Sequence, residues 1–310
     1  MKKKMRIVTT SMATFEDLAP PFNLRHPDPE ENVATVKHIL ETAASSKPDI
    51  VLLPEAIKRA GLSDKHVPSI VEPLDGPTFS VLSEACRKGN FNLVAGHIVS
   101  EGEHIYNEAI VLNRKGQLVG RYKKNYLVQS EMDAKIIPGD EVPVFDLDCG
   151  RIGVSICFDI NWPEMWTTFK KENVDLVCWV SAYEGGFPLK SLAWVNQYPI
   201  ASAVYPYHGR IIDITGEVVA STSRWSRIVS YDLNLDRVLC HTDGQAHKIA
   251  EIQRKYGDQV TVKTYTEEHF ILLENNIKDK TVLDILKEFE MISYADYIAD
   301  CTRNRDAHLL

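Results

Sequence analysis

The sequence predicts an α/β fold, because short apolar runs of strand length alternate with segments of helical periodicity. Residues 50–53 form a continuous apolar run, as in a buried strand, and residues 31–44 carry apolar side chains at helical spacing. Of the 310 residues, 44% are hydrophobic and 25% are charged, which is typical of a globular chain. The apolar stripe of such a helix is expected to pack on a sheet.

The first half of the chain is expected to form strands with two helices between them. A turn at residues 115–116 predicts that the last two of these strands form a hairpin. The predicted elements are strands at residues 6–10, 50–53, 92–99, 107–113 and 117–122, and helices at residues 31–44 and 78–89.

The second half continues the pattern with more strands. Trp162-Pro163-Glu164 places a proline in the first turn of a helix, which marks a helix start. The predicted elements are strands at residues 142–147, 151–156, 176–180, 201–205, 210–213 and 228–233, and helices at residues 163–172 and 189–198.

Beyond residue 235 the character changes to amphipathic helices and charged linkers. Helices are predicted at residues 246–256, 281–289 and 293–304, and a strand at residues 260–265. We therefore expect a catalytic domain over residues 1–240 and a C-terminal arm over residues 241–310. Such an arm packs on its own domain or embraces a neighbouring subunit.

Charge and composition narrow the possible partners and compartment. The chain has 35 basic and 43 acidic residues, so its net charge is 35 − 43 = −8, which argues against a nucleic-acid surface. No run of about 18 apolar residues predicts a membrane span. The six cysteines lack ligand spacing, which predicts a cytoplasmic location and mostly structural thiols.

One thiol stands where a strand gives way to a helix. Cys157 directly follows the strand predicted at residues 151–156, and backbone N–H groups at a helix start are able to bind an oxyanion. An isolated cysteine after a strand is more often a small buried hydrophobe. A neutral thiol also needs a proton acceptor, and Glu55 and Lys124 each follow a predicted strand. Common nucleotide, zinc and serine-hydrolase motifs are absent.

Three spaced motifs resemble the nitrilase superfamily of carbon–nitrogen hydrolases. They are Leu52-Leu53-Pro54-Glu55, Gly120-Arg121-Tyr122-Lys123-Lys124-Asn125-Tyr126-Leu127 and Cys157-Phe158-Asp159-Ile160-Asn161-Trp162-Pro163-Glu164. Tyr106-Asn107 and Pro138-Gly139 match the family as well, and the resemblance covers residues 5–235. It implies a four-layer α-β-β-α sandwich built from two similar sheets.

The resemblance also implies the roles of four residues. Cys157 matches the family's nucleophile, Glu55 its general base and Lys124 its catalytic lysine. Lys124 is chosen over Lys123 because the family's lysine stands two residues after the tyrosine. Glu131 matches a second glutamate that steadies the lysine, with an exposed loop carboxylate as the alternative. No metal or organic cofactor is implied.

The expected pocket surrounds these residues. The backbone N–H of Phe158 is expected to share the oxyanion with Lys124, Trp162 to form an aromatic wall, and Tyr126 to stand where the family often has histidine. Asn161 replaces an arginine that binds acidic substrates in several members, which favours a neutral amide. The loop with Tyr183 and Glu184 is expected to line the pocket mouth, although Glu184 also suits a solvated position.

The expected function is hydrolysis of a small amide or N-carbamoyl compound through a cysteine thioester, with release of ammonia. Nitrile hydrolysis, acyl transfer to an amine, and a catalytically silent binding or scaffold protein of the same fold stay open as alternatives. Members of the superfamily commonly associate through the helices after the cysteine. A homodimer or a larger even-numbered homo-oligomer is therefore expected, with no nucleic-acid or membrane partner.

Overall fold

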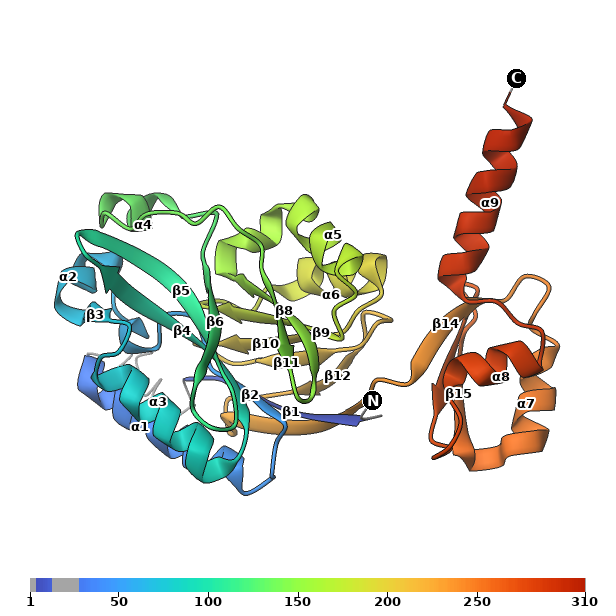
Figure 1. The fold of residues 1–310 in the computed structure, drawn as a ribbon, viewed down its shortest axis with the longest axis horizontal. Helices are drawn as coiled ribbons and strands as arrows, with labels where there is room; N and C mark the ends of the chain where they lie inside the picture. The colour runs from blue at the N-terminus through green and yellow to red at the C-terminus, as the bar shows by residue number, and fades with distance from the viewer. Residues whose placement is uncertain (1–3, 13–27, 310) are drawn as a thin grey trace. The chain divides into compact units, whose positions relative to one another are not determined.

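The computed structural model describes residues 4–12 and 28–309 (Figure 1). Within it, residues Met5–Asp232 form one compact unit, and the residues from Leu233 onward form another. In the described residues no helix has the length and apolar character needed to cross a membrane.

The first sheet has seven strands within the described residues, in the order β13-β1-β2-β4-β5-β6, with β3 beside β4. Strands β1, β2 and β4 are parallel, and β4, β5 and β6 form an antiparallel meander. The bounds are β1 (Lys4–Thr10), β2 (Ile50–Leu52), β3 (Glu72–Pro73), β4 (Asn92–Glu101), β5 (His104–Leu112), β6 (Leu118–Lys123) and β13 (Ile228–Asn234).

The second sheet has six strands in the described part of the chain, in the order β12-β11-β10-β9-β8-β7. Its three central strands, β8, β9 and β10, are parallel, so their carboxyl ends lie at one edge. The bounds are β7 (Val144–Leu147), β8 (Gly150–Ile156), β9 (Leu176–Ser181), β10 (Ile200–Val204), β11 (Arg210–Ile212) and β12 (Val218–Ser221).

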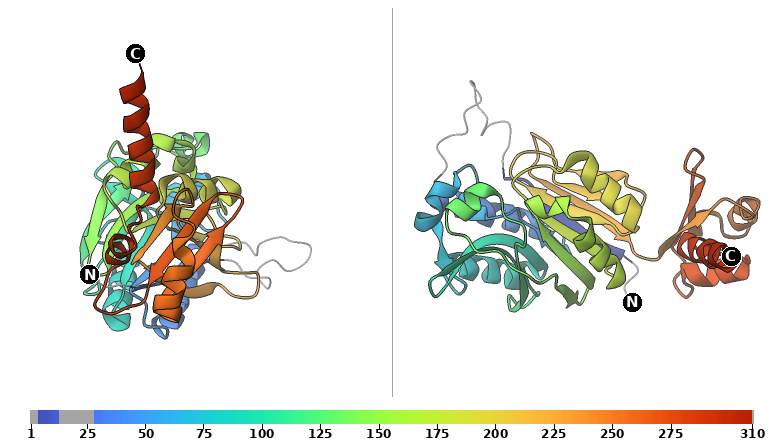
Figure 2. Two further views of the ribbon diagram at one scale, coloured as in Figure 1. Left: turned by 90° about the vertical axis from the view of Figure 1, so that its right-hand side faces the viewer. Right: turned by 90° about the horizontal axis from the view of Figure 1, so that it is seen from above.

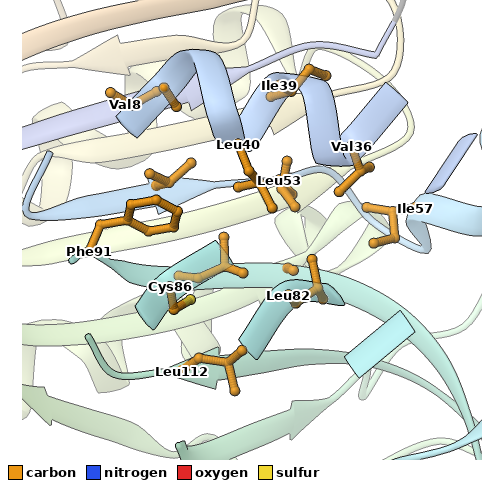
Figure 3. Packing of buried hydrophobic residues seen from close by; sticks show 14 of the residues in the cluster. Val8, Val36, Ile39, Leu40, Leu53, Ile57, Leu82, Cys86, Phe91 and Leu112 are labelled. Atoms are coloured by element: carbon orange, nitrogen blue, oxygen red, sulfur yellow. The ribbon is translucent and has the colours of Figure 1, made fainter. Parts of the chain in front are cut away.

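Helices cover the outer face of each sheet (Figure 2). Helix α1 (Pro29–Ala44) and helix α3 (Pro77–Gly89) pack on the first sheet, where Leu40, Leu82 and Phe91 belong to one buried cluster (Figure 3). Helix α5 (Pro163–Lys171) and helix α6 (Gly186–Asn196) cover the second sheet.

The two sheets face each other in the interior. Thr9 of β1 donates a hydrogen bond from its hydroxyl to the carbonyl of Ser202 in β10, and Ser11 forms a bridge with Val204. The layers therefore run helix, sheet, sheet, helix, and the predicted four-layer α-β-β-α sandwich is confirmed.

The second unit has a core of its own. Its antiparallel sheet has the order β14-β16-β15, and Ile252, Ile271 and Ile285 belong to its buried cluster. Its elements are β14 (Arg237–His241), α7 (Lys248–Tyr256), β15 (Val260–Tyr265), β16 (Phe270–Asn275), α8 (Val282–Glu288) and α9 (Tyr294–His308).

The structure departs from the predicted elements in a few places. Strands β3, β12, β14 and β16 and the short helices α2 (Val67–Ile70) and α4 (Gln129–Asp133) were not predicted. Because β14 pairs with β16, it belongs with the compact unit that begins at Leu233. The division into a catalytic domain over residues 1–240 and an arm over residues 241–310 stays a prediction. The role of this unit as an arm stays a prediction.

Candidate active site

Glu55 lies immediately after β2, in a turn that the neighbouring strand holds in place. The amide of Gly96 in β4 donates to the carbonyl of Pro54 at 2.9 Å, and the Glu55 side chain is fully buried. Ala56 has a φ of 41°, a left-handed conformation that is unfavourable for alanine. The pairing of β2 with β4 therefore helps to hold a strained turn that buries the carboxylate.

Lys124 lies directly after β6 and is 1% exposed. Its Nζ donates to Glu55 Oε1 at 2.9 Å and to Glu131 Oε2 at 2.8 Å. Glu131 is also 1% exposed and lies in helix α4, where its Oε2 accepts from the amide of Val128 at 2.9 Å. Glu131 is thus a buried ion-pair partner of the lysine, and the exposed-loop alternative is excluded.

Cys157 follows β8 and has a φ of 49°. Asp159 stabilises this turn, because its carboxylate accepts from the amide of Ile156 at 2.9 Å and from the hydroxyl of Tyr122 at 2.8 Å. The indole of Trp179 donates to the carbonyl of Cys157 at 3.1 Å. The thiol therefore lies in a turn that several hydrogen bonds hold and whose positive φ is unfavourable for cysteine.

The surroundings determine which of these groups are charged. Burial raises the pKa of Cys157 to about 12, with a further contribution from the Glu55 charge, against the opposing charge of Lys124. Burial would also raise the pKa of Glu55, but the charges of Lys124 and Arg59 outweigh it and lower that pKa. Burial opposes the charge of Lys124, yet the carboxylates around it raise its pKa. The resting site therefore holds a neutral thiol, a carboxylate and an ammonium group.

The aromatic residues of the predicted pocket come together. The rings of Tyr126 and Trp162 stack with centroids 3.8 Å apart, and Phe158 meets Trp162 edge-on at 5.2 Å. The amide of Tyr126 donates to Asp159 Oδ1 at 3.0 Å, which links this cluster to the cysteine turn.

The other predicted pocket residues are engaged locally. Asn161 is exposed, and its Nδ2 donates to the carbonyl of Phe158 at 2.9 Å, within its own turn. Tyr183 is 39% exposed and meets the Trp179 ring edge-on at 5.3 Å. The backbone carbonyl of Glu184 accepts from Arg210 at 3.4 Å.

Sequence reasoning missed several residues of this centre. Asn107 Nδ2 donates to Glu55 Oε1 at 2.7 Å and to Glu131 Oε1 at 2.6 Å. The amide of Ala182 donates to Glu55 Oε2 at 3.0 Å, and Arg59 Nη2 lies 3.9 Å from Glu55 Oε1. Two features of the sequence indicated that these residues lie near Glu55. Asn107 belongs to the Tyr106-Asn107 match with the family, and Arg59 stands four residues after Glu55.

A metal centre is not apparent. Within residues 4–12 and 28–309, no group of three or more His, Cys, Asp or Glu side chains is arranged to hold a metal ion.

The comparisons with known proteins agree with this geometry. A model of the carbon-nitrogen hydrolase family matches residues 18–239. Nitrilase homolog 2 of Dictyostelium discoideum is 29% identical over 240 residues, which cover 67% of this chain and 71% of that protein. Omega-amidase NIT2 of Homo sapiens is 26% identical over 238 residues, which cover 67% of this chain and 84% of that protein.

Solved structures share the fold. Saccharomyces cerevisiae Nit3, a member of branch 10 of the nitrilase superfamily, aligns with a TM-score of 0.64 and 18% identity, covering 83% of this chain and 96% of that one. An amidase from Nesterenkonia sp. aligns with a TM-score of 0.61 and 20% identity, covering 83% and 98%. The family match spans well over half of the sequence, and the chain therefore belongs to the carbon–nitrogen hydrolase family of enzymes, within the nitrilase superfamily.

Proposed function

We propose that this protein hydrolyses a small amide or N-carbamoyl compound through a thioester on Cys157 and releases ammonia. The observation that carries the proposal is the buried cluster in which Lys124 bridges Glu55 and Glu131, beside a thiol on a strained turn. Relatives whose names include omega-amidase support an amide as the substrate.

The first chemical step forms a bond between sulfur and carbon. Because the resting thiol is neutral, its proton passes to the Glu55 carboxylate as Sγ attacks the carbonyl carbon. The carbonyl electron pair moves onto oxygen, and Lys124 Nζ and the amide of Phe158 stabilise that oxyanion. Loss of one such donor costs roughly 3 to 4 kcal/mol in the transition state.

The second half of the reaction releases the two products. When the tetrahedral intermediate collapses, the C–N bond breaks and the protonated Glu55 gives its proton to the leaving nitrogen, which departs as ammonia. Glu55 then removes a proton from water, which attacks the thioester and frees the carboxylic acid and the thiol. Glu131 and Asn107 keep Lys124 and Glu55 aligned through both halves.

The test is ammonia release across aliphatic amides, ω-amides, N-carbamoyl amino acids and nitriles. We expect one class to react, and Cys157→Ala to abolish the release. Cys86→Ala, which removes another buried cysteine from helix α3, is the matched control and should retain activity. Turnover in Cys157→Ala at the wild-type rate would refute the proposal. An acyl product formed only with an added amine would indicate acyl transfer instead.

A neutral amide is the favoured substrate. Asn161 occupies the position where several family members place a substrate-binding arginine, and its amide bonds within its own turn. The stacked pair of Tyr126 and Trp162 supports an apolar acyl group beside the thiol. A higher kcat/KM for ω-amides with a free carboxylate than for neutral amides would contradict this assignment.

We also propose a cytoplasmic protein that forms a homodimer or a larger even-numbered assembly. Phe187 and Val195 of α6 are 74% and 65% exposed, and large apolar side chains at such exposure are common at subunit interfaces. Light scattering coupled to size exclusion measures the mass, and a strictly monomeric mass would contradict the assembly.

A further inference from the structure

Arg59 places a second cation beside the candidate base. It ends a 3₁₀ helix (Ile57–Arg59) that begins two residues after Glu55, and it is 8% exposed. Its Nη2 lies 3.9 Å from Glu55 Oε1, and its Nη1 forms an ion pair with Asp64. The guanidinium therefore lies between two carboxylates in a buried environment.

The far end of this ion-pair chain is tied to the helix that carries Glu131. Asp64 Oδ2 accepts a hydrogen bond from the hydroxyl of Ser130 at 2.6 Å, and Ser130 directly precedes Glu131 in α4. Since Glu131 bonds Lys124, and Lys124 bonds Glu55, the contacts close a ring that returns to the base.

The backbone also directs Arg59 toward this position. The amide of Arg59 donates to the carbonyl of Ala56 at 2.7 Å, and the hydroxyl of Tyr205 donates to the same carbonyl at 3.0 Å. The strained Ala56 turn that places Glu55 therefore places Arg59 as well. A cation with a purely structural role would have no reason to be held by the same turn as the base.

We propose that Arg59 is a positioning residue that keeps Glu55 ionised and aligned for proton transfer. The inference rests on the proposed role of Glu55 as the general base. The guanidinium is already paired with the carboxylates of Glu55 and Asp64. Its charge therefore acts on Glu55 and is not available to bind an anionic substrate. A carboxylate with a nearby cation keeps its charge to lower pH.

The groups that face Glu55 come from every element around it. Lys124 and Arg59 favour its charged form, as do the donors Asn107 and Ala182, and burial opposes it. The other ionisable side chains that interact with this set are Cys157, Glu131, Asp64, Tyr205, Tyr183 and Asp159.

The test compares Arg59→Gln and Arg59→Lys with the control Lys58→Gln. Lys58 is the preceding residue, is also 8% exposed and has its own acidic partner, Glu72, at 2.6 Å. The control therefore removes a buried cation from the same turn without touching Glu55. The readout is the pH profile of kcat/KM between about pH 4 and 9 for the amide that the ammonia assay identifies.

A second readout needs no substrate. The rate at which iodoacetamide alkylates Cys157 is measured over the same pH range in a Cys301→Ser background, which removes the exposed thiol. If no amide is hydrolysed by the wild type, the proposed function fails, while the alkylation profile still tests Arg59.

Arg59→Gln is expected to raise the pKa of Glu55. On acidification, the base would then become protonated at a higher pH than in the wild type. The acid limb of both profiles should move up by about one unit, a tenfold loss on its acid side. Arg59→Lys should keep the wild-type limb, and so should Lys58→Gln.

Other outcomes would overturn the inference. These are acid limbs of Arg59→Gln that coincide with those of the wild type, an equal shift in Lys58→Gln, or a higher KM only for acidic substrates. If Arg59→Gln does not fold, Asp64→Asn serves as the second variant. In Asp64→Asn, Glu55 is the remaining carboxylate beside Arg59. The acid limb of this variant is expected at the wild-type pH or at a lower pH. An acid limb at higher pH would also overturn the inference.

Discussion

Cys157 and Glu55 form a neutral thiol and a carboxylate rather than a preformed ion pair. Burial raises the pKa of the thiol to about 12, whereas nearby cations lower the pKa of the carboxylate. Thiolate formation is therefore unfavourable at rest, and in the proposed reaction the thiol loses its proton only as sulfur attacks the substrate. This arrangement protects a buried thiol from oxidation, because the thiolate is the reactive form.

Replacing the base should separate chemistry from folding. We expect Glu55→Gln to lower kcat/KM by about 10² to 10⁴, since an amide side chain cannot accept the thiol proton. The amide oxygen of the new side chain would still accept the bond from Asn107, but its NH₂ would face the amide of Ala182, so we expect a lower melting temperature in a chain that still folds. Glu72→Gln, another buried carboxylate beside the same turn, is the control for activity. Retention of most activity in Glu55→Gln would exclude this residue as the base.

Glu108 of β5 gives the stability of the protein a specific pH dependence. Burial raises its pKa to about 7, against the opposing charge of Arg121, whose Nη1 lies 3.6 Å from Glu108 Oε2. Between the ordinary carboxyl pKa and about 7, the folded state keeps a proton that the unfolded chain releases. Stability therefore falls as pH rises through this window.

Glu108→Gln should remove this loss. We expect the variant and the wild type to differ little near pH 4, and the variant to be more stable by about 1 to 3 kcal/mol above pH 7. Urea unfolding at several pH values measures the difference. A constant offset across the range would show that Glu108 does not titrate in this way.

At the scale of elements, the close approach of β4 to the turn after β2 decides where Glu55 lies. A Cβ on Gly96 would stand 2.3 Å from the Cα of Glu55 and 2.5 Å from the amide nitrogen of Ala56, both of them backbone atoms. Because backbone cannot move aside as a flexible side chain can, only glycine fits between these two segments.

Gly96→Ala should therefore displace the base. We expect kcat/KM to fall at least tenfold and stability to fall by about 1 to 3 kcal/mol from overpacking. Gly102→Ala in the β4–β5 turn is the comparison, since its added Cβ meets no atom within 4 Å, although its φ of 60° also carries strain. Activity that falls equally in both variants would argue against a local effect on Glu55.

At the scale of the whole molecule, the two compact units have separate hydrophobic cores. The candidate active-site residues all belong to the unit Met5–Asp232. Ile271 is fully buried in the core of the second unit. A substitution there tests whether the C-terminal residues contribute to the site of their own chain or of a neighbour.

Ile271→Ala should destabilise the second unit by about 2 to 5 kcal/mol. We expect a separate, earlier unfolding transition by calorimetry and a kcat/KM within about twofold of wild type at temperatures below it. Loss of activity together with that transition would instead mean that the C-terminal unit completes an active site.

Much of the fold was predictable because strand and helix periodicity is a local property of the sequence. The exceptions have physical causes. Strand β16 is almost wholly buried, and its apolar run has no alternation to distinguish a strand from a helix. Helix α4 has only five residues, too few to show a period, so the burial of Glu131 could not be predicted from its position.

The sequence by itself determined the family and the residue types at the ends of three strands, because motifs and their spacing are written along the chain. Tertiary structure alone decided which groups meet. Lys124 and Glu55 are 69 positions apart and come within 2.9 Å only after β2 and β6 join one sheet with β4 and β5 between them. The contact of Asn107 with Glu55, 52 positions away, and the charge on each group depend on burial and on distances between remote segments, which no local pattern contains.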